Sequence, residues 1–208
     1  MKNNSKLIFF ISLTLFFQNI HSEEISLKNY LTNINTMEAD FEQSNYSNSN
    51  ALIDKSIGHI KIKKPDNLLW DIELPFSKKI ALQKDTLRIF DSQLNQLLIS
   101  SIPMEIENSF LILLLSNANI LNFYSIVKIE KDGDEEQFSL VGNNRRNIFE
   151  KIEIYITKDK LSKFIFVSAT NESIELELMN VLINKHLPDK DFIINVSDNT
   201  EIIDQKND

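Results

Sequence analysis

The sequence predicts a mainly β protein of the α+β type: an incomplete, strongly curved antiparallel β-barrel of about ten or eleven strands, with a helical lid over an apolar cavity. Short segments in which apolar and polar residues alternate recur along the chain, with the period of half-buried strands. Turn residues separate them at about the spacing of an antiparallel barrel or sandwich. Strands and helices do not alternate, which argues against a doubly wound sheet.

The beginning of the chain resembles a secretory signal peptide. Residues 1–22 contain two lysines, an apolar run from Leu7 to Phe17 and a small residue, Ser22, before the expected cleavage. We therefore expect residues 23–208 to form a single exported, soluble domain, long enough to bury a large core. The chain has no cysteine, so neither a disulfide scaffold nor acylation of the protein itself is expected.

The predicted mature chain is acidic. Removing residues 1–22 takes away two lysines and no acidic residue, which leaves 20 Lys and Arg against 30 Asp and Glu, a net charge of about −10. This balance argues against nucleic acid as a partner, because neutralising phosphates requires a basic surface. It is compatible with a carrier that does not adhere to anionic membranes.

The first elements are a helix and a strand. Apolar residues in 25–35 have the spacing of one helical face, and Ser26 is a suitable N-cap. Met37, Ala39 and Phe41 then alternate with acidic residues, which predicts a strand.

Residues 58–91 predict a four-stranded antiparallel meander. Ile60 and Ile62 alternate with lysines in the first strand, and Pro65 to Asn67 supply a turn. In the second strand the residues expected on one face are Leu68, Trp70, Ile72 and Leu74. Strands over 77–83 and 86–91 complete the meander, whose tight turns and single apolar face are typical of antiparallel sheets.

One more short strand is expected over 93–100. In residues 104–123 the alternation of apolar and polar residues then gives way to continuous apolar runs. The run from Phe110 to Leu115 is continuously apolar and leucine-rich, which favours one or two short helices over a buried strand. The rest is β again, with hairpins over 124–141 and 149–168, a strand over 173–183 and a last strand at 192–195.

The sequence contains no catalytic or metal-binding motif. Its three glycines form neither a phosphate loop nor a nucleophile elbow. The histidines have no metal-ligand spacing, and the carboxylates are most simply a solvated surface. We therefore expect no enzyme activity, no metal and no cofactor.

Order and spacing of these segments resemble the outer-membrane lipoprotein carrier protein (LolA) family over most of the mature chain. The resemblance rests on the helix followed by Met37 to Gln43 with its Phe-x-Gln, on Lys63-Lys64-Pro65, on the strand with Trp70, on Pro75, and on the closing segment 87–91. The proline-rich segment that follows the last strand in this family is missing from the C-terminal part of this sequence. The resemblance implies a curved sheet whose open end is covered by helices.

Two kinds of site residue follow from this resemblance. Lys64 has the parity of Ile60 and Ile62, so a regular strand would point it inward, although a lysine beside a proline more often lies at a strand end in water. The resemblance implies that it occupies the place of a family arginine that holds the lid closed, without that residue's planar fork of donors. The residues that would line the acyl-chain cavity are Phe41, Leu68, Trp70, Ile72, Phe90, Met104, Phe110, Leu111, Leu113 and Leu114. From the pattern alone, ordinary core packing is the preferred interpretation of Trp70 and of the 110–115 run, and the face of Phe90 is ambiguous.

The function implied is that of a monomeric periplasmic carrier. It would take triacylated lipoproteins from an inner-membrane ABC exporter, shield their acyl chains, and deliver them to an outer-membrane receptor. Two alternatives remain: a binding protein of the same architecture for another lipid or glycolipid, and an exported β-module with a filled core.

Overall fold

The computed structural model describes residues 27–102, 115, 120–144 and 147–206. The chain divides into two compact units, of which the second covers residues 34–208. In the first unit the described part is a short helix over residues 27–33, within the predicted range 25–35. The second unit contains all the strands that the structure describes.

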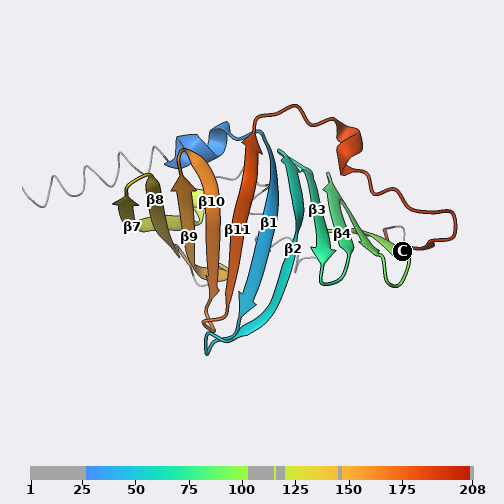
Figure 1. Cartoon of the computed structure of the whole chain (residues 1–208), viewed down its shortest axis with the longest axis horizontal. Helices are drawn as coiled ribbons and strands as arrows, with labels where there is room; N and C mark the ends of the chain where they lie inside the picture. Colours follow the sequence, from blue (N-terminus) through green and yellow to red (C-terminus); the bar gives the residue numbers. More distant parts are fainter. Residues whose placement is uncertain (1–26, 103–114, 116–119, 145–146, 207–208) are drawn as a thin grey trace, which may run out of the picture. The chain divides into compact units, whose positions relative to one another are not determined.

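Within the described residues, twelve strands and two short 3-10 helices follow one another along the chain (Figure 1). Their bounds are β1 Thr36–Tyr46, β2 Leu52–Lys63, β3 Asn67–Leu74, β4 Lys78–Gln83, β5 Thr86–Asp91, β6 Gln96–Ser101, η1 Ile120–Asn122, β7 Tyr124–Asp132, β8 Glu135–Gly142, β9 Phe149–Thr157, β10 Lys160–Ser168, β11 Ser173–Ile183, η2 Asp189–Phe192 and β12 Glu201–Asp204.

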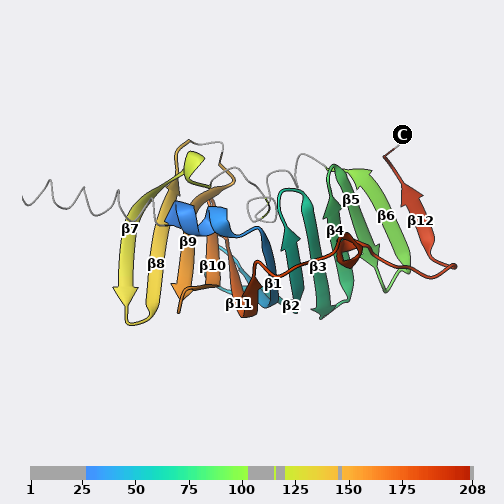
Figure 2. The same cartoon turned by 90° about the horizontal axis from the view of Figure 1, so that it is seen from above.

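The strands form one sheet in the order β12-β6-β5-β4-β3-β2-β1-β11-β10-β9-β8-β7. The two outer strands, β12 and β7, are not paired with each other, so the sheet is open (Figures 1 and 2). Hairpins join the successive strands of two meanders, β1–β6 and β7–β11, and β1 pairs with both β2 and β11. The mainly β class is therefore confirmed, and the described residues contain twelve strands where about ten or eleven were expected.

Gly58 lies at a close approach of the β2 and β3 backbones. A Cβ atom placed on it would overlap the backbone carbonyl of Asp71, and the pairing of β2 with β3 shifts register at this point. Glycine in a strand often marks such a bulge or close backbone approach. The shift also corrects one expectation: Leu74 pairs with Ile57 and is 55% exposed, instead of following Trp70 and Ile72 on the buried face.

The C-terminal segment differs from the sequence prediction. Residues 192–195 do not form a strand; η2 ends at Phe192, and the last strand is β12. β12 pairs with β6 in parallel, so the sheet is mixed and not wholly antiparallel. The reason is the connection: the chain leaves β11 in the middle of the sheet and crosses several strands to reach the edge, instead of turning back in a hairpin (Figure 2).

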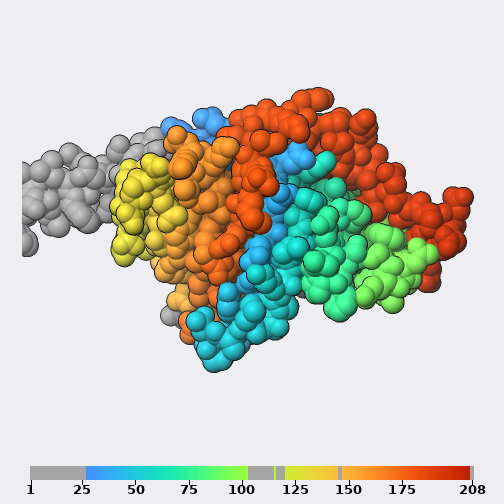
Figure 3. Space-filling view, viewed as in Figure 1, coloured from blue at the N-terminus to red at the C-terminus, as the bar shows by residue number. Residues whose placement is uncertain are grey.

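This crossing segment is held by both apolar and ionic contacts. Phe192 is fully buried, and η2 packs against β3 and β4. Asp189 accepts a hydrogen bond from Lys63 at 2.6 Å, and Asp191 lies 3.6 Å from the Lys61 ammonium. The space-filling view shows the red C-terminal segment lying against the teal and green strands (Figure 3).

Substituting Gly58 with alanine should lower the free energy of unfolding by about 2–3 kcal/mol, because the new methyl group forces β2 and β3 apart. Urea denaturation followed by Trp70 fluorescence measures the change. Gly133→Asn is the matched control, since Gly133 has a positive φ of 58° that asparagine tolerates and has no atoms nearby to clash with. Equal stability of Gly58→Ala and the wild type would contradict the close approach.

Phe192→Ala should lower the free energy of unfolding by about 3–5 kcal/mol, the usual cost of removing a fully buried phenylalanine ring. Its neighbour Ile193 is 52% exposed, so Ile193→Ala serves as the control and should cost less than about 1 kcal/mol. Both values come from the same urea titration. If the two variants lose equal stability, the C-terminal segment is not anchored through Phe192.

Candidate functional site

The candidate site is one face of the sheet, which we call the apolar face. Antiparallel pairing places directly opposed residues on the same side, so the register of the strand pairs defines this face strand by strand. Its central row runs from Ala39 through Ile60 and Trp70 to Ile80 and Ile89. Ile60 and Trp70 are at most 2% exposed. Period-two alternation in each strand is what aligns these residues.

Phe41 and Trp70 form an aromatic contact at the centre of the apolar face. Their ring centroids are 4.2 Å apart with the planes tilted by 35°, and both side chains are buried. Phe41 belongs to β1 and Trp70 to β3, with β2 between them. Phe41 pairs with Gly58 of β2, and because glycine has no side chain, the two rings can meet across that strand.

The apolar face continues across the second meander. Phe41 pairs with Leu178 of β11, Leu176 pairs with Phe164, and Phe164 pairs with Ile154. Phe166 stacks on Phe164 at a centroid distance of 5.7 Å and contacts Phe149 at 5.0 Å. Aromatic side chains therefore occupy this half of the apolar face as well, although no residue of β9, β10 or β11 was predicted to line the cavity.

Of the predicted cavity residues, the structure brings four together on the apolar face. Phe41, Leu68 and Trp70 are buried, and Ile72 is half-buried opposite Gly58. Phe90 is separated from them: it pairs with Lys79 and Leu97, and Lys79 forms an ion pair with Asp71 on the opposite face of the sheet. The predicted residues outside the described part of the chain are Met104, Phe110, Leu111, Leu113 and Leu114.

Lys64 directly follows the last residue of β2. Its backbone N–H donates to the Asn35 carbonyl at 2.9 Å, and its side chain is half-buried. Burial lowers the pKa of the Lys64 ammonium below its ordinary value, because a charged group loses hydration there. The adjacent Lys63 extends to Asp189. The two neighbouring lysines therefore have different environments, and the role of Lys64 as a latch remains a prediction.

The arrangement offers apolar contact and no catalytic chemistry. The apolar face bears aliphatic and aromatic side chains in its central rows, and the ion pairs of β1–β4 lie on the other face. Among the described residues, no group of three or more His, Asp or Glu side chains is placed to hold a metal ion. In the same part of the chain, no helix is long and apolar enough to cross a membrane.

Comparisons with known proteins agree with this geometry. Residues 32–195 match the family model of the outer membrane lipoprotein carrier protein LolA. The outer-membrane lipoprotein carrier protein of Francisella tularensis is 28% identical over 203 residues, covering 95% of this chain and 94% of the relative. That of Idiomarina loihiensis is 25% identical over 196 residues, covering 94% of each chain.

The fold also has a solved counterpart. An uncharacterized conserved protein from Thermus thermophilus superposes with a TM-score of 0.57 at 10% identity, covering 89% of this chain and 99% of its own. LolA proteins are periplasmic carriers and not enzymes, in keeping with a site built from apolar surface. On the match over residues 32–195, this chain belongs to the LolA family of outer-membrane lipoprotein carrier proteins.

Proposed function

We propose that this protein carries triacylated lipoproteins through the periplasm and that its apolar face, covered by a helical lid, shields their acyl chains. The observation that carries the proposal is the continuity of the apolar face from β9 through the Phe41–Trp70 contact to β5. A row of this extent is suited to a long hydrocarbon chain. Membership of the carrier family supports the same role.

The energetics require a large apolar surface. Exposing an acyl chain of about sixteen carbons to water costs on the order of 12 kcal/mol, at about 0.8 kcal/mol per methylene. A carrier must offset most of this cost and still release its cargo. A lid that closes over the empty sheet meets both demands, because opening it consumes part of the free energy gained on binding.

We assign Lys64 as the residue that stabilises the closed state. Its half-buried ammonium at the end of β2 and its lowered pKa fit a charged group directed toward the interior. The proposal also includes an inner-membrane ABC exporter as donor, an outer-membrane receptor as acceptor, a monomeric protein, and export directed by residues 1–22.

Native mass spectrometry after incubation with a triacylated lipoprotein should detect a one-to-one complex. Trp70 fluorescence should shift on binding, because Trp70 lies in the central row of the apolar face. A parallel incubation with phospholipid distinguishes the carrier from a binding protein for another lipid. No complex with either ligand would favour a β-module with a filled core.

Lys64→Leu should release bound lipoprotein to the receptor several-fold more slowly than the wild type, because the closed state that favours release is lost. Transfer of a labelled lipoprotein to receptor-bearing vesicles measures the rate. The matched control is Lys63→Leu, which removes the same charge from the side chain that pairs with Asp189. Normal transfer by Lys64→Leu would show that Lys64 is not the latch.

A further inference from the structure

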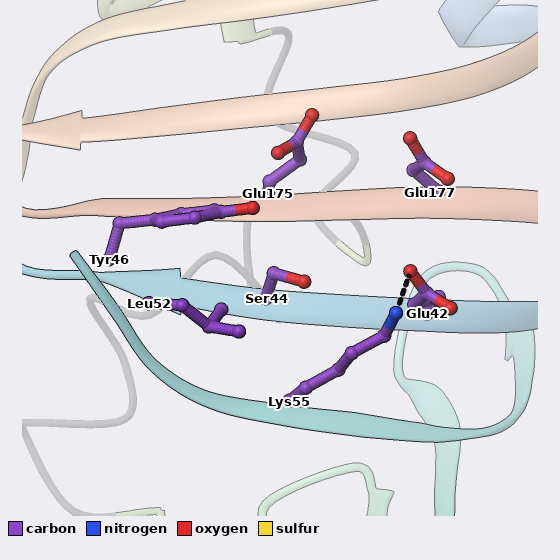
Figure 4. Close-up of a pocket in the computed structure, with 7 residues that line it drawn as sticks. All are labelled: Glu42, Ser44, Tyr46, Leu52, Lys55, Glu175 and Glu177. Carbon is purple, nitrogen blue, oxygen red and sulfur yellow. Dashed lines mark ion pairs between the residues drawn. The ribbon is translucent and has the colours of Figure 1, made fainter. Parts of the chain in front are cut away.

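A small polar hollow lies on the opposite face of the sheet, which we call the polar face. Its floor is Ser44 of β1, and we refer to it as the Ser44 hollow (Figure 4). Its volume is about 170 Å³. The lining side chains come from β1, β2 and β11: Glu42, Ser44, Tyr46, Leu52, Lys55, Glu175 and Glu177.

The register explains why a hollow forms there. Ser44 pairs with Lys55 on one side and with Glu175 on the other, while Glu42 and Tyr46 precede and follow it on the same face of β1. Four long side chains therefore surround one short side chain. The space above Ser44 stays open because a serine side chain is too short to fill it.

Within the described part of the chain, the Ser44 hydroxyl is a hydrogen-bonding group without a protein partner. Ser44 is only 8% exposed, and none of the described residues forms a hydrogen bond with its hydroxyl. Figure 4 shows the side chain among the other lining residues. The hydroxyl faces the open hollow, so a ligand group that enters the hollow can form a hydrogen bond with it.

The charges around the hollow favour a cation. Lys55 pairs with Glu42 at 2.6 Å, and Lys163 pairs with both Glu175 and Glu177. Three carboxylates thus share two ammonium groups, which leaves one negative charge unbalanced. Tyr46 adds an aromatic ring beside this excess, and cations bind favourably at aromatic faces.

The size of the hollow limits the ligand to a single side chain. Ligand pockets for small molecules measure about 300–1,000 Å³, well above the volume found here. The volume corresponds to roughly five or six water molecules at about 30 Å³ each. A planar guanidinium fits the features best, because it hydrogen-bonds carboxylates in a fork and stacks on aromatic rings.

We propose that the Ser44 hollow is a docking site for an arginine side chain presented by a partner protein. The guanidinium lies beside Tyr46, donates hydrogen bonds to Glu175 and the Ser44 hydroxyl, and balances the excess negative charge. The acidic net charge of the protein assists the encounter with a basic partner surface. The site is on the face opposite the lipid-binding proposal and does not depend on it.

The test is an NMR titration of the protein with the peptide acetyl-Gly-Arg-Gly-amide. Saturable shifts of the backbone amides around Ser44, Lys55 and Glu175 are expected, with an affinity in the millimolar range for one side chain. The citrulline peptide, which has the same shape without the charge, should give no saturable shifts. Raising the ionic strength should weaken the arginine peptide's binding, because the site is open to solvent.

Two variants separate the hollow from general charge effects. Ser44→Leu fills the hollow and should weaken binding by about fivefold or more. Glu175→Gln removes one carboxylate and should weaken it by about two- to fivefold, the effect of losing one partly exposed ion pair. Glu136→Gln, which removes the same charge from the ion pair with Lys131, is the control and should bind normally. Equal shifts with the citrulline peptide, no saturation with the arginine peptide, or unchanged affinity in both hollow variants would overturn the proposal.

Discussion

The contact between Phe41 and Trp70 joins β1 to β3 across β2, and the apolar face depends on it. β1 is also the strand at which the two meanders meet, since it pairs with β2 on one side and β11 on the other. A register slip of one residue in β1 would move its apolar side chains to the polar face. Gly58 pairs with Phe41, and its missing side chain permits the close approach of β3 beside the aromatic pair.

The two faces of the sheet differ in their chemistry. The apolar face gathers aliphatic and aromatic side chains from both meanders, which suits a long hydrocarbon chain. The polar face carries ion pairs such as Lys55–Glu42 and receives the C-terminal segment through Phe192, Asp189 and Asp191. This division leaves protein partners a charged surface away from the apolar face, and the Ser44 hollow is one feature of that surface.

Local pattern was a reliable guide only while strands stayed regular. Phe41, Leu68, Trp70 and Ile72 were predicted correctly on one face because their alternation is unbroken up to Ile72. Leu74 was predicted on that face and is not there, because the register shifts between Ile57 and Gly58. Phe90 had no clear parity in the sequence, and only its pairing with Lys79 assigns it to the polar face.

The sequence by itself determined the mainly β class, most strand positions and the carrier family, since alternation and turn residues act over a few neighbours. Tertiary structure decided the rest. The parallel pairing of β12 with β6 and the burial of Phe192 depend on where a long connection crosses the sheet. The Ser44 hollow likewise joins residues of β1, β2 and β11, whose proximity comes from strand order, and no local pattern encodes strand order.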